Sequence, residues 1–235
     1  KDDLEDFVAR NVDRTRLRFW TTGGSSGTPM GVYHDKYTGQ LYECAYRYRQ
    51  WGWAGYRFWD RKAWLYRGEM NIFGDRGKQT FWDYNTHENE LVLSARNMNE
   101  ANMQKYVEKI RQHRPKFFYG IPSAFEILAR YMKRNAIEDI SADAIFCWAE
   151  TLYPWQRDII ESQFHSKVFA EYGMSEHAAD AVECECHEGY HVSMEYGILE
   201  LVDENNEPIT EPGVLGRVVG TGFHTQVMPF IRYAT

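Results

Sequence analysis

Hydrophobic and polar positions along the chain predict short strands and amphipathic helices in succession. A run of strand-forming residues, Leu17–Thr21, leads into a loop rich in glycine, serine and threonine at positions 22–31. An aromatic-rich pattern with helical spacing follows, from about Thr38 to Tyr56. The first sixty residues therefore predict a strand, a polar loop and a long helix.

Strands and helices alternate over the next hundred residues. Short apolar runs predict strands at Lys62–Arg67, Glu90–Ser94, Lys116–Tyr119, Asp143–Trp148 and Lys167–Ala170. Apolar positions spaced three and four apart predict helices at Asn99–His113, Pro122–Arg134 and Pro154–Phe164. Such alternation is typical of an α/β fold, in which helices flank a largely parallel sheet.

The pattern changes after residue 190. Three short strands are predicted at His191–Met194, Gly197–Val202 and Gly216–Thr221, and turn-forming residues separate them. We therefore expect an α/β core over residues 1–190, followed by a small β-rich subdomain, a meander, over residues 191–235.

Composition and charge narrow the class of protein. The 235 residues are 43% hydrophobic and 26% charged, an ordinary globular mixture, and their net charge is −7. Residues 166–235 carry 3 basic and 12 acidic side chains, which argues against nucleic acid as a partner because phosphate binding needs clustered cations. No apolar run reaches the roughly 18 residues of a membrane span, and no signal peptide precedes the four cysteines. These features predict a cytoplasmic protein with reduced thiols and no transmembrane segment.

The loop at positions 21–31 is the most informative segment. Its glycines expose backbone N–H groups and its hydroxyl side chains add donors, which is what a polyphosphate requires. It is neither a Walker A loop nor a dinucleotide fingerprint. It does contain Gly23-Gly24-Ser25-Ser26-Gly27, a match to the nucleophile elbow of serine hydrolases with Ser25 as nucleophile. That elbow needs a helix directly after the loop, which Pro29 and Gly31 oppose, so we favour a phosphate loop.

Four segments in one order resemble the motifs of the adenylate-forming, AMP-binding superfamily of acyl-CoA synthetases. The loop resembles its phosphate-binding motif, and Glu171–Glu176 (Glu-Tyr-Gly-Met-Ser-Glu) resembles its Tyr-Gly-x-Ser/Thr-Glu motif. Trp148–Leu152 resembles the segment that borders the adenine, and Met228–Tyr233 resembles the approach to its Tyr-x-Thr-Gly-Asp motif. The residues in these segments are most similar to those of the phenylacetate–CoA ligase branch, and within that branch to the CapK-like proteins of capsular polysaccharide biosynthesis.

The resemblance implies an enzyme that activates a carboxylic acid as an acyl-adenylate, using ATP and Mg²⁺, and transfers the acyl group to CoA or another acceptor. Glu176 would hold Mg²⁺, and it would form the catalytic group together with Thr22 and Ser25. Met30 stands where most members have lysine. The acid is expected near positions 119–123 and 174–178. The residues expected to bind the nucleotide are Thr21, Thr22, Gly23, Gly24, Ser25, Ser26, Gly27, Thr28, Ala149, Glu150, Thr151, Tyr172 and Gly173.

A second candidate metal site lies at positions 183–191. Cys184, Cys186, His187 and His191 could supply four zinc ligands, although their spacing is not one of the usual zinc-knuckle spacings. The alternative is a solvated acidic loop whose thiols are incidental.

Members of the superfamily are longer than this chain and carry a C-terminal domain with a catalytic lysine. The chain stops at Thr235, where the family continues with Gly-Asp. The resemblance therefore implies a core truncated at both ends, a central piece that does not complete adenylation alone. A non-catalytic binding or scaffolding module of polysaccharide assembly is the other alternative, and the oligomeric state is not readable from the sequence.

Overall fold

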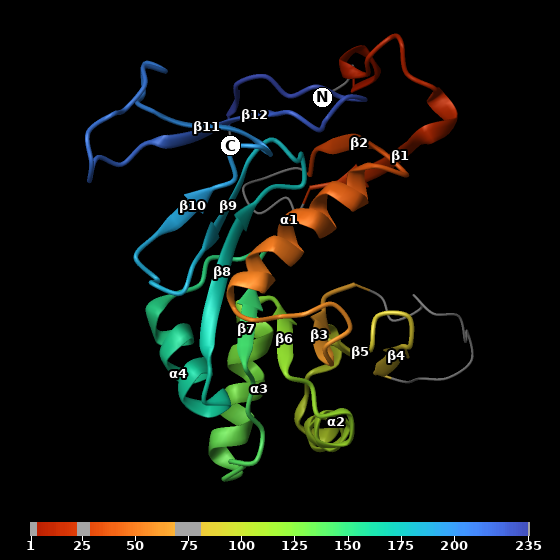
Figure 1. The fold of residues 1–235 in the computed structure, drawn as a ribbon, viewed down its shortest axis with the longest axis vertical. Helices are drawn as coiled ribbons and strands as arrows, with labels where there is room; N and C mark the ends of the chain where they lie inside the picture. The colour runs from red at the N-terminus through yellow and green to blue at the C-terminus, as the bar shows by residue number, and fades with distance from the viewer. Residues whose placement is uncertain (1–3, 23–28, 69–80, 235) are drawn as a thin grey trace. The chain divides into compact units, whose positions relative to one another are not determined.

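The computed structural model describes residues 4–22, 29–68 and 81–234 (Figure 1). The chain divides into two compact units. We call residues 50–171 and 183–188 the sheet unit, and residues 1–49, 172–182 and 189–235 the hairpin unit. The boundaries of these two units differ from the predicted division at residue 190. That division separates an ATP-binding core from a β-rich subdomain, and it stays a prediction.

A mostly parallel sheet forms the centre of the sheet unit. Its strands lie in the order β8-β7-β6-β3-β5-β4, and only the edge pair β4–β5 is antiparallel. Strands β5 to β7 are buried throughout, as expected for strands covered on both faces. The strands are β3 (Lys62–Tyr66), β4 (Trp82–Asn85), β5 (Glu90–Ser94), β6 (Phe117–Gly120), β7 (Ala144–Cys147) and β8 (Lys167–Gly173).

Three helices of the sheet unit share one hydrophobic core with these strands: α2 (Glu100–His113), α3 (Pro122–Arg134) and α4 (Pro154–Phe164). Local sequence sets their ends. The Asn99 side chain accepts a hydrogen bond from the Asn102 amide at the start of α2, and proline occupies the first turn of α3 and of α4. The predicted apolar stripe of α2 is buried in this core, at Met103, Tyr106, Val107 and Ile110.

Gly120 ends β6 in a conformation that favours glycine. Its φ is 154°, and a Cβ atom there would lie 2.7 Å from the Leu65 carbonyl oxygen of the neighbouring strand. The Gly120 carbonyl accepts a hydrogen bond from the Trp148 amide at 3.1 Å. The close approach of Leu65 therefore favours glycine at this position, and the Gly120 carbonyl binds the residue that follows β7.

The hairpin unit consists of small antiparallel sheets. Strands β1 (Leu17–Thr21) and β2 (Gly31–Asp35) form one, and β11 (Gly197–Val202), β12 (Arg217–Gly222) and β13 (Tyr233–Ala234) form another. Helix α1 (Gly39–Trp53) begins in this unit. The short strands β9 (Asp180–Glu183) and β10 (Tyr190–Val192) and the 3₁₀ helices Leu4–Phe7, Arg14–Arg16 and Ala95–Asn97 complete the elements of the described residues.

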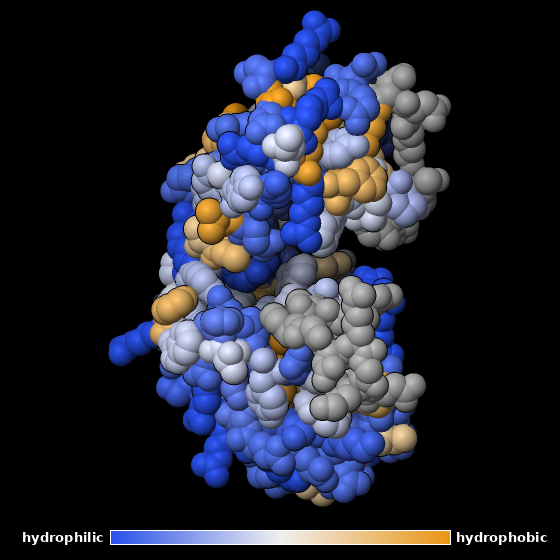
Figure 2. Space-filling view, turned by 90° about the vertical axis from the view of Figure 1, so that its right-hand side faces the viewer, coloured by the Kyte–Doolittle hydropathy of each residue, from blue (hydrophilic) through white to orange (hydrophobic). Residues whose placement is uncertain are grey.

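The predicted fold class is confirmed: helices flank a largely parallel sheet, and a β-rich region follows it. Sequence reasoning did not predict β2, β4 or β9, which are short and lack a clear alternation of apolar and polar residues. Among the described residues no helix is both long and apolar enough to cross a membrane. Figure 2 shows one face of the molecule, where hydrophilic residues predominate and hydrophobic ones form small separate patches.

Candidate functional site

The predicted phosphate loop connects the two strands of the β1–β2 hairpin. Thr21 pairs with Gly31, and beyond that pair the Thr22 amide donates to the Met30 carbonyl at 2.9 Å. The Met30 amide donates in return to Thr22 Oγ1 at 3.0 Å. Gly23, Gly24, Ser25, Ser26, Gly27 and Thr28 lie outside the described residues. Thr22 thus closes the base of the loop with both its backbone and its hydroxyl.

The hairpin does not support the serine hydrolase alternative. A nucleophile elbow joins a strand directly to a helix, whereas the chain after this loop forms the antiparallel strand β2. Pro29 and Gly31, which oppose a helix at this point, precede and begin that strand.

His34 on β2 ties the hairpin to the segment that contains Glu176. Its Nε2 lies 2.8 Å from the Ser175 carbonyl oxygen, and its ring stacks on the His177 ring with centroids 4.1 Å apart. Burial lowers the pKa of both histidines to about 4, and for His34 the nearby His177 adds to this effect. Both rings are therefore neutral near pH 7. The strand that follows the predicted loop and the residues around Glu176 therefore meet through two neutral, stacked rings, although they lie far apart in sequence.

Glu176 is a buried carboxylate without a counter-charge in the part of the chain that the structure describes. It is only 7% exposed, and no arginine, lysine or histidine among those residues forms an ion pair with it. Its Oε1 accepts a hydrogen bond from the Tyr233 hydroxyl at 2.7 Å. Burial and the neighbouring carboxylate both raise the pKa of Tyr233, so the phenol stays protonated and donates. A buried, uncompensated carboxylate favours a cation as its partner.

Apolar packing supports the same corner of the hairpin unit. Val32, Ala178, Met228 and Phe230 form a buried cluster, and the Met30 side chain packs against it. Met30 therefore contributes to this apolar cluster and adds no positive charge to the loop.

Tyr172 and Gly173, the expected adenine neighbours on this side, end strand β8. Tyr172 is half-buried and Gly173 is exposed.

The other adenine-bordering segment, Ala149–Thr151, lies in the sheet unit. Ala149 has a positive φ of 63°, unusual for a residue with a side chain. Glu150 Oε2 accepts a hydrogen bond from the Ser123 amide at 3.1 Å in the first turn of α3, and its Oε1 lies 4.0 Å from Arg67 Nη1. Glu150 therefore caps a helix whose own N-cap residue, Ile121, offers no side-chain acceptor.

The candidate zinc ligands do not form a metal-binding group in the part of the chain that the structure describes. No group of three or more histidine, cysteine or acidic side chains among the described residues is arranged to hold a metal ion. His187 Nδ1 instead lies 3.3 Å from Arg157 Nη1 and 3.5 Å from Glu183 Oε2. Arg157 and Glu183 form a two-pronged ion pair at 2.8 Å, and the Glu183 carboxylate also accepts from the Ala170 amide. This network engages the ring of His187, which is only partly exposed.

Sequence reasoning missed a second cluster in the hairpin unit. The Tyr196 hydroxyl donates to Glu43, whose Oε1 lies 3.6 Å from His177 Nδ1. Burial raises the pKa of Glu43. The stacking of His34 on His177 was also missed, because neither ring belongs to a motif with recognisable spacing and their contact arises only in the fold.

Comparison with solved structures defines the class of fold. No family model matches the chain. A 2-hydroxyisobutyryl-CoA ligase in complex with 2-HIB-AMP and CoA superposes with a TM-score of 0.71 at 17% identity, over 97% of this chain and 53% of that one. The anthranilate CoA ligase AuaEII with anthranoyl-AMP gives 0.57 at 17% identity, over 89% and 39%. The chain therefore has the fold of the adenylate-forming CoA ligases, as the motif order predicted.

One curated relative extends the similarity to sequence. Protein CapK of Staphylococcus aureus is 28% identical over 244 residues, which cover 97% of this chain and 50% of CapK. The chain is thus similar in sequence to CapK and spans about half the length of that relative.

Proposed function

We propose that this chain forms the ATP-binding core of an enzyme that activates a carboxylic acid. An oxygen of the acid attacks the α-phosphorus of ATP, the bond to pyrophosphate breaks, and an acyl-adenylate forms. The acyl group then passes to CoA or another acceptor, with release of AMP. The observation that carries the proposal is the contact of His34, on the strand leaving the phosphate loop, with the Ser175–His177 segment around the buried Glu176 carboxylate.

The residues present suit a magnesium–nucleotide complex. Glu176 is the acidic group that would hold the ion, and Mg²⁺ prefers oxygen ligands together with substrate phosphates. The ion would neutralise charge on the transferred phosphate. Thr21 and Thr22 stand at the base of the loop that would hold the outer phosphates, and Ser25 belongs to the same loop.

The adenine contacts predicted for Tyr172, Gly173 and the Ala149–Thr151 segment stay part of the proposal. Because the Glu150 carboxylate already caps α3, we assign it to holding its segment in place, and the backbone of Ala149 and Thr151 to bordering the base. The predicted acid pocket near Tyr119–Ser123 remains a proposal as well.

The acyl acceptor, the biological role and the branch of enzymes each rest on fewer observations. The neighbouring ligase structures contain acyl-AMP, and one contains CoA, which supports adenylation followed by thioester formation. We propose a role in capsular polysaccharide biosynthesis on the similarity to CapK alone, and a place in the phenylacetate–CoA ligase branch on the sequence motifs alone. The acid and its acceptor follow from neither.

Acid-dependent exchange of pyrophosphate into ATP tests the proposal. The complete protein is assayed with a panel of aryl, acyl and amino acids, as wild type and as Glu176→Gln. We expect at least one acid to support exchange, and the variant to lose on the order of 100-fold because it removes a preorganised charge beside the reacting phosphate.

Glu195→Gln is the matched control, since Glu195 is an exposed acid of the same unit that pairs with Arg49. Its exchange rate should stay near wild type. Unchanged exchange in Glu176→Gln would contradict the metal assignment. A wild-type protein that gives no exchange with any acid would favour the non-catalytic module.

A further inference from the structure

Tyr233 is placed to control the Glu176 carboxylate. Its hydroxyl is the one side-chain donor to Glu176 among the hydrogen bonds of the described residues, with Oε1 as acceptor at 2.7 Å. Because an ionised carboxylate can accept up to about four hydrogen bonds through two oxygens, this contact leaves Oε2 for another partner. The hydrogen bond also holds the Glu176 side chain in one orientation.

The Tyr233 ring is itself held from two directions. Its backbone belongs to β13, where it pairs with Gly220 of β12. Its ring packs edge-on against Phe230 with centroids 5.0 Å apart, and Phe230 belongs to the buried cluster with Val32 and Ala178. The hydroxyl is therefore carried on a side chain with little freedom to move.

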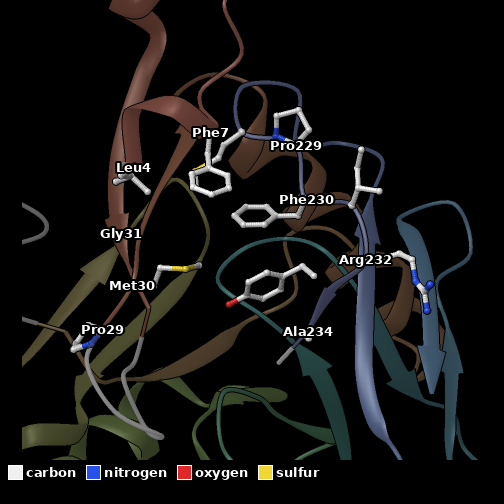
Figure 3. Close-up of a pocket in the computed structure, with 12 residues that line it drawn as sticks. Leu4, Phe7, Pro29, Met30, Gly31, Pro229, Phe230, Arg232 and Ala234 are labelled. Carbon is white, nitrogen blue, oxygen red and sulfur yellow. The ribbon is translucent and has the colours of Figure 1, made fainter. Parts of the chain in front are cut away.

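Tyr233 also lines a cavity. The residues at the end of the phosphate loop line the opposite side of the same cavity. The cavity, of about 520 Å³, is lined by Pro29, Met30 and Gly31 from the loop exit and by residues 228–234 opposite them. Figure 3 shows Met30 and Phe230 extending toward each other from these two walls. Tyr233 thus connects the loop exit with the carboxylate proposed to hold the metal.

We propose that Tyr233 is a positioning residue that fixes the Glu176 carboxylate for binding a divalent metal ion, an inference that rests on the proposed function. The residue acts through Glu176 and does not touch the ion. Its removal should weaken metal binding more than it slows the chemical step at saturating metal.

The test compares Tyr233→Phe with wild type in the complete protein. The first readout is the Mg²⁺ concentration that gives half-maximal pyrophosphate exchange. The second is Mn²⁺ affinity, measured by electron paramagnetic resonance in the presence of β,γ-methylene-ATP, which needs no turnover. We expect Tyr233→Phe to raise both values about three- to tenfold, the range of one hydrogen bond to a charged group, with the rate at saturating Mg²⁺ within about twofold.

Two further variants separate positioning from packing. Tyr196→Phe removes a comparable tyrosine–carboxylate hydrogen bond, to Glu43, elsewhere in the same unit. Phe230→Leu loosens the packing around Tyr233 but retains its hydroxyl. Both should keep the metal requirement of wild type, so a shift in either that equals the Tyr233→Phe shift would overturn the proposal even if Tyr233→Phe folds less well.

The outcomes distinguish this inference from the proposed function. If Glu176→Gln weakens Mn²⁺ binding and Tyr233→Phe does not, the inference is wrong and the metal assignment stands. If Glu176→Gln leaves Mn²⁺ affinity unchanged, or if wild type binds no Mn²⁺, both are wrong. If no acid supports exchange but Tyr233→Phe still weakens Mn²⁺ binding, the catalytic proposal fails and the positioning role stands.

Discussion

The sheet unit and the hairpin unit differ in how their buried carboxylates are compensated. Lys62 and Arg157 pair with buried carboxylates in the sheet unit, whereas Glu176 in the hairpin unit has no ion pair among the described residues. In the sheet unit the core is a continuous set of aliphatic and aromatic residues, with Phe118, Phe125 and Phe164 in mutual contact at its centre. In the hairpin unit, one buried apolar cluster of the described residues comprises Val32, Ala178, Met228 and Phe230. The same unit also withdraws titratable groups such as His34, Glu176 and Asp180 from solvent.

The difference indicates that the sheet unit mainly stabilises the fold and that the hairpin unit holds the groups proposed for chemistry. Apolar burial stabilises a fold at roughly 25 cal/mol per Å², whereas burying an uncompensated carboxylate such as Glu176 costs free energy. A protein keeps such a group where a ligand can compensate it. We therefore expect substitutions in the sheet unit to act mainly on stability, and those around Glu176 to act mainly on metal-dependent activity.

The largest expected effect on stability comes from the centre of the sheet unit. Phe118→Ala should lower the free energy of unfolding by about 4 kcal/mol, because the ring is fully buried among other rings. Phe230→Ala in the hairpin unit should lower it by only about 2 kcal/mol, since Phe230 already borders a cavity. Urea denaturation of both variants measures the contrast, and equal losses would break the comparison.

A buried ion pair in the sheet unit gives the next effect. Lys62 Nζ lies 3.0 Å from Glu88 Oε2 and 3.9 Å from Glu90 Oε1, and the Lys62 side chain is 3% exposed. Burial raises the pKa of Glu90, yet Lys62 still offsets its charge. Lys62→Met should therefore lower the free energy of unfolding by about 3 kcal/mol, as measured by urea denaturation at pH 7.

The double variant Lys62→Met/Glu90→Gln is the control for that prediction. It removes the charge that Lys62→Met leaves buried, so it should recover at least part of the loss. A double variant less stable than Lys62→Met alone would mean that packing, and not charge, dominates at this position.

The smallest effect concerns Asp35 at the end of β2. Burial tends to raise its pKa, but the Arg16 guanidinium and the amides of Tyr37 and Thr38 outweigh burial and hold the pKa at about 2. Since this value lies below the unfolded value of about 3.9, the ionised group stabilises the fold above pH 4, and the gain disappears as the pH falls through 2.

Asp35→Asn should consequently cost at most about 1 kcal/mol at pH 7, because Arg16 is half-exposed and its ion pair is weak. The difference from wild type should shrink toward zero near pH 2 in urea denaturation across pH. A difference that grows as the pH falls would contradict the assigned ion pair.

Much of the sheet unit follows from sequence alone, for a physical reason. The strands predicted at Lys62–Arg67 and Glu90–Ser94 and the helix at Pro122–Arg134 agree with β3, β5 and α3 to within a residue. Apolar periodicity determines these elements because each buries one side against a broad core. The order of the motifs likewise sufficed to predict the fold of the adenylate-forming ligases.

Only the tertiary structure decided what the polar residues do. Glu176 was predicted as a metal ligand, but its hydrogen bond to Tyr233 joins positions 57 residues apart. Glu150 was expected at the adenine, and the structure adds that its carboxylate caps α3. The cysteines and histidines at 184–191 were a candidate zinc site, and the described residues hold no group of three such side chains arranged for a metal ion. Hydrogen bonds and ion pairs depend on direction and on distances of a few tenths of an ångström, which a pattern along the chain does not encode. The sequence by itself determined the sheet and the order of the motifs, and the fold decided which charges meet.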